Sequence, residues 1–352
     1  MKKILSIFLC ALMLSMLGCG GGNGEKAAQT PEAKPEPKKL KVVTTIFPLY
    51  DWTRQILGGE SSNVELTMLL KSGVDMHSFQ PTADDLVKLS SCDVLIYVGG
   101  ESDQWIEDAR KEAVNKNMVV LRLMDALGDR LKHEESVEGM DTHKHHHDHK
   151  HPDEKDGHKH EENHKDNEKH EHHDEYDEHI WLSLKNAALC ADAITDALAR
   201  ADAAHAETYK ANAADYRKKL SALDQEYTAA ALASPTKTLL FGDRFPFRYL
   251  VDDYGLKYFA AFPGCSAETE ASFETIAFLA AKLDELKLPA ILTIEGGSRK
   301  VAETILYNTA KHDQKILVLD SMQSTVGDKS AAGRDYLTVM RSNLEVLKEA
   351  LK

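Results

Sequence analysis

The chain has 352 residues, of which 43 are Lys or Arg and 57 are Asp or Glu, so its formal net charge at pH 7 is −14. This acidic balance argues against nucleic acid and anionic membrane surfaces as partners, and it suits a protein that collects cations. The length allows one large domain or two mid-sized ones.

The N-terminus has the pattern of an export signal. Two lysines precede an apolar run from Ile4 to Leu17, which is followed by a glycine and Cys19. The run is too short for a stable membrane span, and no later stretch reaches its length without charges. We expect residues 1–19 to be a signal peptide with a lipobox, in which Cys19 becomes the lipidated N-terminus. An ordinary signal peptide with an incidental cysteine is the alternative.

Residues 20–39 are expected to form a flexible tether. They are mainly Gly, Lys, Glu, Pro and Ala, with almost no large apolar side chain. Such a segment cannot bury enough apolar surface to fold by itself. The predicted protein is therefore anchored to the membrane by lipid, with its body outside the cytoplasm, at the cell surface or in the periplasm.

Strands alternate with helices in the first part of the body. β-branched and apolar runs predict four strands, at residues 41–47, 64–69, 94–98 and 118–123. Helices are expected between them, at residues 48–57, 83–90 and 105–115. This alternation predicts a mostly parallel sheet with helices on both faces.

The alternation stops at residues 132–178, which are mainly His, Asp, Glu and Lys. Thirteen of the 17 histidines of the chain lie between His133 and His173. Low complexity predicts a disordered loop inside the N-terminal lobe. Because imidazole is a common zinc ligand, we interpret the loop as a weak, multivalent zinc collector. A merely solvated polar loop is the alternative.

A long helix is predicted at residues 206–232, after an Ala-rich helix at residues 182–201. The long helix contains no Gly or Pro, and at about 1.5 Å per residue it would extend about 40 Å, which is enough to cross two lobes. Alternating strands and helices then resume, with strands expected at residues 238–241, 256–262, 290–294 and 316–319. Helices are expected at residues 244–254, 272–287, 299–311 and 336–351.

The predicted fold class is therefore α/β, with two lobes. Each lobe holds a roughly four-stranded, mostly parallel sheet with flanking helices, and one long backbone helix joins the lobes. The N-terminal lobe is expected over residues 40–205 and the C-terminal lobe over residues 233–352. Of the cysteines after Cys19, Cys92 and Cys190 fit core positions, and the wide spacing with Cys265 is not that of a zinc finger or a disulfide scaffold. One disulfide among these three remains open.

Three motifs resemble those of one family, the zinc- and manganese-binding solute receptors of bacterial ABC transporters (the ZnuA/TroA-like group). Residues 77–82 (HSFQPT) resemble its H-x-[YF]-x-P-[ST] loop, and residues 98–105 resemble its G-x-x-x-E-x-W turn. Residues 179–182 (HIWL) are similar to the end of its D-P-H-[IV]-W-L motif, and the His-rich insertion before them is typical of the zinc branch. The resemblance extends from about Lys41 to the C-terminus.

The resemblance implies a metal site in the cleft between the lobes, with His77 and His179 as ligands. The family usually has a third histidine at the first helix of the second lobe, but this chain has none there. Asp243 is the nearest residue that could bind the metal, and a helix N-cap is its alternative role. For the family's fourth, acidic ligand we select Asp320, with a strand-end turn as the alternative. Glu295 is a weaker candidate.

A second departure from the family pattern lies just before His179. The usual Asp-Pro is replaced by Asp177 and Glu178. Because proline restricts the backbone, we expect this change to alter the rigidity of the loop more than its chemistry.

The function implied by the resemblance is that of a receptor without enzymatic activity. It would capture Zn²⁺ and, as a monomer, deliver it to an ABC permease and its ATPase. Manganese is the second choice of metal, because an aspartate in place of a histidine adds an oxygen ligand. A zinc hydrolase is a rival function, which needs an open coordination position on the metal and a general base. The absence of an H-E-x-x-H motif from the sequence counts against it. An adhesin or a periplasmic metal buffer is another.

Overall fold

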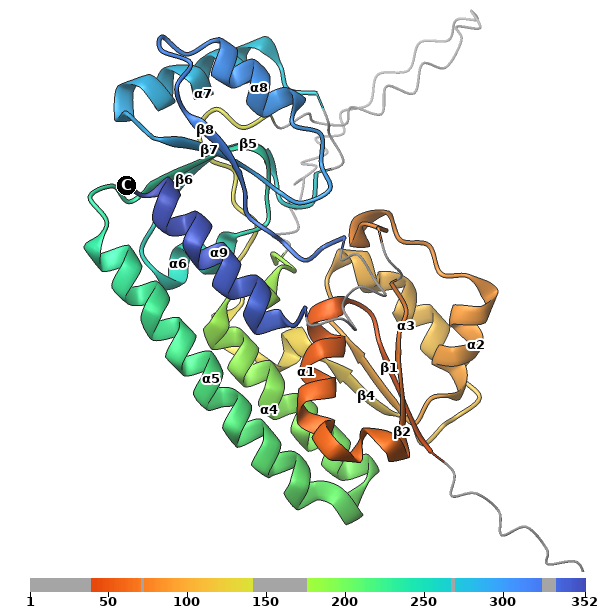
Figure 1. Ribbon diagram of the computed structural model, residues 1–352. Helices are drawn as coiled ribbons and strands as arrows, with labels where there is room; N and C mark the ends of the chain where they lie inside the picture. Colours follow the sequence, from red (N-terminus) through yellow and green to blue (C-terminus); the bar gives the residue numbers. More distant parts are fainter. Residues whose placement is uncertain (1–38, 71–72, 142–175, 267–269, 325–333) are drawn as a thin grey trace, which may run out of the picture. The chain divides into compact units, whose positions relative to one another are not determined.

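Two parallel four-stranded sheets organise the body of the protein (Figure 1). The computed structural model describes residues 39–70, 73–141, 176–266, 270–324 and 334–352. Residues from Lys39 to Lys352 belong to one compact unit. The predicted signal peptide with Cys19, most of the predicted tether and residues 142–175 of the His-rich segment lie outside the described residues.

The first sheet has the strand order β2-β1-β3-β4, and every neighbouring pair is parallel. Its strands are β1 (Leu40–Thr44), β2 (Val64–Met68), β3 (Val94–Tyr97) and β4 (Val119–Arg122). Alternate side chains face opposite sides, as a strand requires. Val42, Val94 and Ile96 join one core cluster, whereas Val43, Leu95 and Tyr97 join another.

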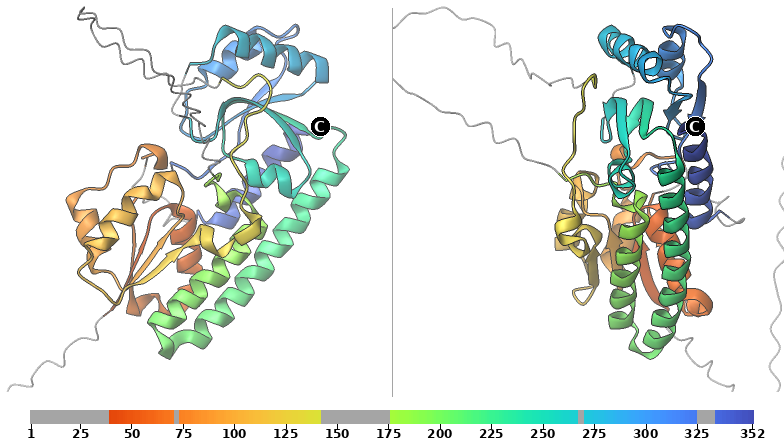
Figure 2. Two further views of the ribbon diagram at one scale, coloured as in Figure 1. Left: turned by 180° about the vertical axis from the view of Figure 1, so that it is seen from behind. Right: turned by 90° about the vertical axis from the view of Figure 1, so that its left-hand side faces the viewer.

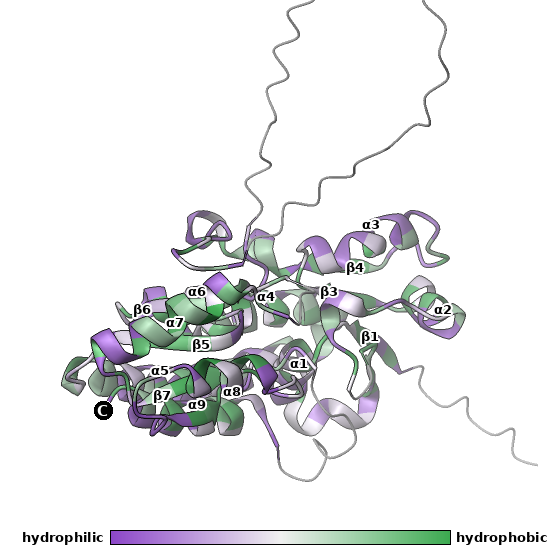
Figure 3. Ribbon diagram, turned by 90° about the horizontal axis from the view of Figure 1, so that it is seen from above, coloured by the Kyte–Doolittle hydropathy of each residue, from purple (hydrophilic) through white to green (hydrophobic). Residues whose placement is uncertain are grey.

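Helices cover both faces of the first sheet. They are α1 (Phe47–Leu57), α2 (Ala83–Ser91), α3 (Gln104–Lys111) and α4 (Leu184–Ala201). Residues of α1 and α4 fill the first of these clusters, and residues of α2 and α3 fill the second. Helix α3 is coloured largely hydrophilic in Figure 3. The predicted parallel sheet with helices on both faces is confirmed.

The second sheet repeats the arrangement with the order β6-β5-β7-β8, again with all pairs parallel. Its strands are β5 (Thr238–Phe245), β6 (Lys257–Pro263), β7 (Ala290–Thr293) and β8 (Lys315–Val318). The helices are α6 (Arg248–Asp253), α7 (Phe273–Leu286), α8 (Lys300–Tyr307) and α9 (Tyr336–Ala350). Residues of α7 and α8 pack together in one cluster, whereas those of α6 and α9 belong to the same cluster as α1 and α4.

The long helix α5 (Ala206–Ala233) has 28 residues and connects the two sheets. It packs against α1 and α4 of the first lobe and against α9 of the second (Figures 1 and 2). Its buried residues recur every three or four positions, which is the spacing of one helix face. Neither α5 nor any other helix of the described ranges is long and apolar enough to cross a membrane.

One hydrophobic core is shared by both lobes. The same cluster contains Val94 of the first sheet and Leu292 of the second. Across the junction, the ring centroids of Trp52 in α1 and Tyr336 in α9 lie 5.1 Å apart. Because close-packed cores resist sliding, we expect only small movements of one lobe against the other.

Strand β5 is longer than expected, and this changes the role of Asp243. The strand continues to Phe245, because Arg244 pairs with Phe262 and Phe245 pairs with Pro263 after a register shift. Helix α6 begins only at Arg248, and its N-cap is Phe247. The predicted helix start at Arg244 is therefore wrong, and Asp243 is not a helix cap.

The two ends of the predicted His-rich loop lie on the body. His133 forms an isolated antiparallel bridge with Tyr176, and the two rings stack with centroids 4.4 Å apart. The backbone N–H of Asp141 donates to the carbonyl of Ala261 at 2.9 Å. The expectation of disorder across the whole of residues 132–178 was therefore too broad at both ends.

The Tyr336 hydroxyl ties α9 to the segment that follows His179. It donates to the carbonyl oxygen of Trp181 at 2.6 Å, and both side chains are fully buried. We expect Tyr336→Phe to lower the free energy of unfolding by about 1–3 kcal/mol, because a buried carbonyl loses its donor. Denaturant unfolding measures this, with Tyr307→Phe at a 76% exposed position as the control. Equal transitions for the two variants would contradict the proposed importance of this bond.

Candidate metal centre

His77 lies in a short 3₁₀ turn, Met76–Ser78, in the loop after β2. The Asp75 carboxylate accepts a hydrogen bond from the backbone N–H of His77 at 3.0 Å and so holds the turn. On the ring, Nδ1 lies 2.9 Å from Ser102 Oγ and 3.1 Å from Glu178 Oε1. These contacts occupy Nδ1, so Nε2 is the ring nitrogen that remains for a metal.

His179 is fully buried and is held by the residue two positions before it. The Oδ1 atom of Asp177 accepts from the backbone N–H of His179 at 2.8 Å and lies 3.0 Å from its Nδ1. Burial opposes the charged imidazolium, but the carboxylate of Asp177, together with those of Glu178 and Glu134, outweighs burial and raises the pKa of His179. Here too Nδ1 is occupied and Nε2 is available.

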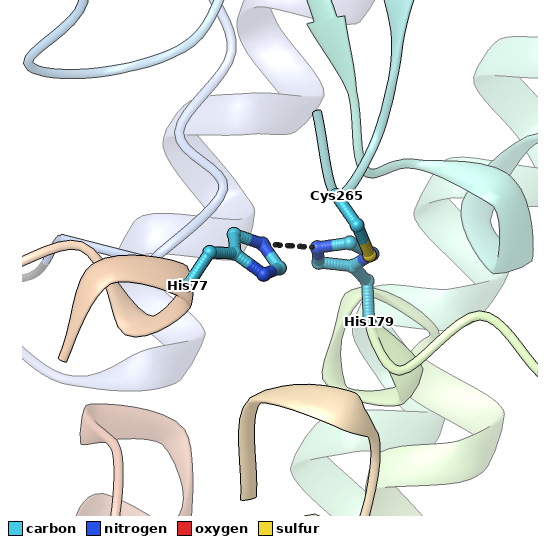
Figure 4. Close-up of side chains that lie close together, drawn as sticks. All are labelled: His77, His179 and Cys265. Atoms are coloured by element: carbon cyan, nitrogen blue, oxygen red, sulfur yellow. Dashed lines mark hydrogen bonds between the residues drawn. The ribbon is translucent and has the colours of Figure 1, made fainter. Parts of the chain in front are cut away.

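The two available nitrogens converge. Nε2 of His77 lies 3.2 Å from Nε2 of His179, as the dashed line in Figure 4 marks. Oxygen acceptors at both Nδ1 atoms place the ring protons there, so each Nε2 presents a lone pair. A tetrahedral zinc ion with bonds of about 2.0–2.1 Å separates its nitrogen ligands by about 3.3 Å. The spacing of the two rings therefore fits a shared metal ion.

Cys265 completes a group of three side chains that could hold a metal ion. It follows β6, and its Sγ atom and one nitrogen of each of the two imidazoles all lie within 4.8 Å of one another (Figure 4). Among the described residues, no other set of three His, Cys, Asp or Glu side chains was found to meet this spacing. Burial, together with the nearby carboxylates of Glu178 and Glu134, raises the pKa of the Cys265 thiol far above its usual range. A metal ion that binds this sulfur must therefore displace its proton.

Gln323 lies against both imidazoles. Its Nε2 atom is 3.0 Å from Nε2 of His77 and 2.5 Å from Nε2 of His179. The residue is only 1% exposed. Its position in the loop after β8 brings a fourth polar group from the second lobe to the same point.

Asp243, predicted as a ligand, is not part of this group. From within β5 its carboxylate accepts hydrogen bonds from the backbone N–H groups of Arg244 at 2.8 Å and Ile294 at 3.1 Å. It lines a cavity that His77 also borders. In this structure, Asp243 therefore supports the ends of β5 and β7 beside the site.

Asp320, the other predicted ligand, follows β8 and is also outside the group. Its Oδ1 accepts from the N–H of Met322 at 2.9 Å, and its Oδ2 forms an ion pair with Arg334. Burial raises the pKa of Asp320, whereas Arg334 opposes the rise. The ligation that the sequence predicted for Asp243 and Asp320 is tested by the substitutions below.

Glu178 has a different role from the one expected of it. Its Oε2 accepts from the N–H of Ser102 at 3.1 Å, and its Oε1 accepts from the Ser102 hydroxyl at 2.6 Å, beside Nδ1 of His77. Burial favours the protonated acid, but hydrogen bonding with His77 and the charges of the two imidazoles outweigh it and lower the pKa of Glu178 to about 2. The replacement of proline at this position therefore changes the chemistry around His77.

Sequence reasoning placed the two histidines but assigned no role to Cys265 or Gln323. Cys265 had one usable signal, since it stands three residues after the predicted strand 256–262, at the edge of the sheet where ligands bind. Gln323 had none, because a lone glutamine three residues beyond Asp320 resembles any polar loop residue.

Comparisons with known proteins identify a family. A model of the family described as ZnuA, zinc-uptake complex component A, periplasmic, matches residues 42–350. The chain is 33% identical over 316 residues to the zinc-binding protein AdcA of Streptococcus pyogenes, a match that covers 88% of this chain and 56% of that protein. It is 30% identical over 351 residues to the zinc-binding lipoprotein AdcA of Streptococcus pneumoniae, covering 99% of this chain and 61% of that protein.

The fold is shared with a solved structure. The Zn(II)-bound ZnuA-like domain of Streptococcus pneumoniae AdcA aligns with a TM-score of 0.66 at 25% identity. The alignment covers 89% of this chain and 99% of that domain. The chain thus matches one domain of its longer streptococcal relatives and spans 56–61% of their length.

Asp177 is expected to control the metal affinity through His179. Replacing Asp177 with Asn removes the carboxylate that faces Nδ1 of His179, and loss of such a partner typically weakens metal binding about 10–100-fold. Competition between the protein and a zinc chelator measures the change. Asp108→Asn, at an exposed position on α3, makes the same chemical change away from the site and should have no effect. Unchanged zinc affinity in Asp177→Asn would contradict the role given to this carboxylate.

Proposed function

Because the chain belongs to the family of ZnuA, the periplasmic component A of zinc-uptake complexes, we propose that it is an extracytoplasmic receptor for Zn²⁺. It captures the ion at His77, His179 and Cys265 and delivers it to an ABC permease and its ATPase. The protein acts by binding and release.

The convergence of three ligand atoms carries the proposal. Two imidazole nitrogens 3.2 Å apart, with a thiol within 4.8 Å, come from loops of both lobes. Holding two lone pairs so close is unfavourable unless a cation or hydrogen-bond donors lie between them. A metal ion bound there would bridge the lobes, as a receptor with a cleft site requires.

The ligand types favour zinc over manganese. Imidazole and thiolate are preferred by zinc, whereas manganese prefers carboxylate, carbonyl and water oxygens. The presence of Cys265 therefore removes the argument that Asp243 gave for manganese. A hydrolase would need an open position for a metal-bound water and a free general base. Glu178, the carboxylate next to the group, is already bonded to Ser102 and His77.

The anchoring and the partners follow from the N-terminal pattern and the family. Cys19 is proposed as the lipid attachment point, and the relative from Streptococcus pneumoniae is itself named a lipoprotein. The permease and its ATPase are the expected partners of a zinc-uptake component. The protein is proposed to meet them as a monomer.

Single substitutions test the ligand set. We expect His77→Ala, His179→Ala and Cys265→Ser each to weaken zinc binding at least about 100-fold, or about 2.7 kcal/mol, because each removes a direct ligand. Asp243→Asn and Asp320→Asn keep the shape of the side chain and should change the affinity less than about tenfold. Calorimetric titration with zinc in the presence of a competing chelator measures all five.

The opposite pattern would reassign the site. If Cys265→Ser binds zinc as tightly as the parent while Asp243→Asn or Asp320→Asn loses it, the carboxylates are ligands and the sulfur is not. A sulfur-to-metal charge-transfer band in the Co²⁺-loaded parent, and its absence in Cys265→Ser, gives an independent check on the sulfur.

The His-rich segment can be tested by two deletions of different length. Removing residues 142–175 should leave one tight site and abolish several weak ones, because this stretch holds most of the histidines. Removing residues 134–175 should also weaken the tight site, because Glu134 accepts a hydrogen bond from the N–H of Cys265 at 3.2 Å. If zinc titrations give the same affinity for the tight site in both deletions, Glu134 does not support that site. Retention of all weak sites in the shorter deletion would show that the tract is not a zinc collector.

A further inference from the structure

Gln323 is a buried polar side chain at the site, and the proposed function gives it no role. We infer that its amide is a two-sided, specificity-determining group, in which the NH₂ side holds the lone pairs of His77 and His179, and the Oε1 side coordinates the captured ion. The inference rests on the proposed capture of zinc at these histidines. It assigns a neutral oxygen donor to the loop after β8, in which the acidic residue Asp320 was the predicted ligand.

The donor side of the amide matches the two imidazoles. Nδ1 of His77 faces Ser102 and Glu178, and Nδ1 of His179 faces a carboxylate. These oxygens hold the ring proton at Nδ1, so each Nε2 atom is a hydrogen-bond acceptor. A primary amide carries two N–H groups on one nitrogen. The Gln323 Nε2 atom lies 3.0 Å and 2.5 Å from the two imidazole Nε2 atoms, so one N–H can serve each.

The acceptor side of the amide is left without a donor. Gln323 Oε1 is buried and has no hydrogen-bond partner among the described residues. A buried carbonyl in this position costs about 1–3 kcal/mol. The reverse orientation would be worse here, since Oε1 would then face two nitrogen lone pairs. The orientation in the structure thus follows from the chemistry of the histidines.

Hydrogen bonds fix the backbone of Gln323, whereas the last torsion of its side chain can rotate. Glu295 accepts from the N–H of Gln323 at 3.0 Å and from the N–H of Ser321 at 2.6 Å. The carbonyl of Ser321 in turn accepts from the indole N–H of Trp181 at 2.8 Å. Glu295, considered from the sequence as a weak ligand candidate, therefore positions the loop that carries Gln323.

A half-turn of the amide exchanges its two sides. A metal ion that binds the lone pairs of both imidazoles displaces the N–H donors of Gln323. A lone pair cannot bind the metal and accept a hydrogen bond at the same time. The last torsion of a glutamine is broad and roughly two-fold, so the amide can turn without moving the backbone. Oε1 then lies where Nε2 was, next to both imidazole nitrogens, which is the place of a further ligand on the same ion.

A neutral amide affects which metal is kept. With two imidazoles, one thiolate and an amide oxygen, the site carries a single negative charge. A carboxylate at the same place would add a second charge and a stronger oxygen ligand, which favours harder cations such as manganese. Gln323 therefore acts against the binding of manganese.

The test uses the full-length mature protein and two matched variants. Gln323→Glu replaces the amide by a carboxylate of the same shape, and Gln225→Glu, at an exposed position on α5, adds the same charge away from the site. Zinc and manganese affinities are measured for each by chelator competition. We expect Gln323→Glu to narrow the preference for zinc over manganese at least about tenfold, and Gln225→Glu to leave it unchanged.

NMR of the uniformly ¹⁵N-labelled parent tests the two sides directly. After chelator treatment, the Gln323 side-chain amide should show nitrogen–nitrogen scalar couplings across its hydrogen bonds to the two imidazoles. One equivalent of zinc should abolish them. Gln323→Leu assigns the signal.

Two results would overturn the inference: no such coupling in the chelator-treated protein, or an equal metal preference in Gln323→Glu and Gln225→Glu. These failures differ from failure of the proposed function. If Cys265→Ser and His179→Ala lose zinc but the metal preference does not respond to Gln323→Glu, zinc capture stands and the role of Gln323 falls. If the parent holds no zinc at the histidines, the proposed function falls first.

Discussion

The approach of two imidazole nitrogens to 3.2 Å is the constraint on which the site depends. Each ring is fixed from behind by oxygen acceptors, so both lone pairs face the same point. Two glycines permit this crowding. A Cβ atom at Gly264 would lie 3.0 Å from Cε1 of His179, and one at Gly100 would lie 2.1 Å from Oε2 of Glu178. Larger residues at these positions would push the rings or their carboxylate away.

The packing of the body explains how such a close approach is maintained. Helices that pack on both sheets share one core. Within it, Trp181 links its own segment to α9 and to the loop after β8. Its carbonyl accepts from Tyr336 in α9, and its indole donates to Ser321 in the loop of Gln323. Because these bonds are buried, the segment of His179 and the loop of Gln323 cannot separate without breaking them. The side chains proposed to bind zinc are thus brought into position by the fold itself.

Acidic residues around the site hold the backbone and balance cations. Arg244 of β5 pairs with Asp75 at 2.6 Å, which ties the turn of His77 to the second lobe. Asp243 and Glu295 accept backbone N–H groups, and Asp320 pairs with Arg334. Most of these carboxylates near the proposed zinc site are therefore already bonded to N–H groups or arginines. The chemistry of the site is left to two imidazoles, a thiol and an amide.

The amino-acid sequence alone determined the order of strands and helices, the two sheets and the long helix, and it marked His77 and His179 as candidate ligands. These features depend on local patterns: apolar periodicity over a few residues, and short motifs around each histidine. The tertiary structure decided the rest of the site. Gln323 lies 246 residues from His77 and 144 from His179 in the chain, and Cys265 comes from another loop again.

The role of Asp243 was decided in the same way. The extension of β5 to Phe245 depends on pairing with β6, which no local pattern reveals, and this pairing places Asp243 inside a strand. Sequence periodicity reports which face of an element is buried. It does not report which loop ends meet where two sheets come together, and the side chains of these meeting loops, brought together by the shared core, decide which atoms can hold an ion.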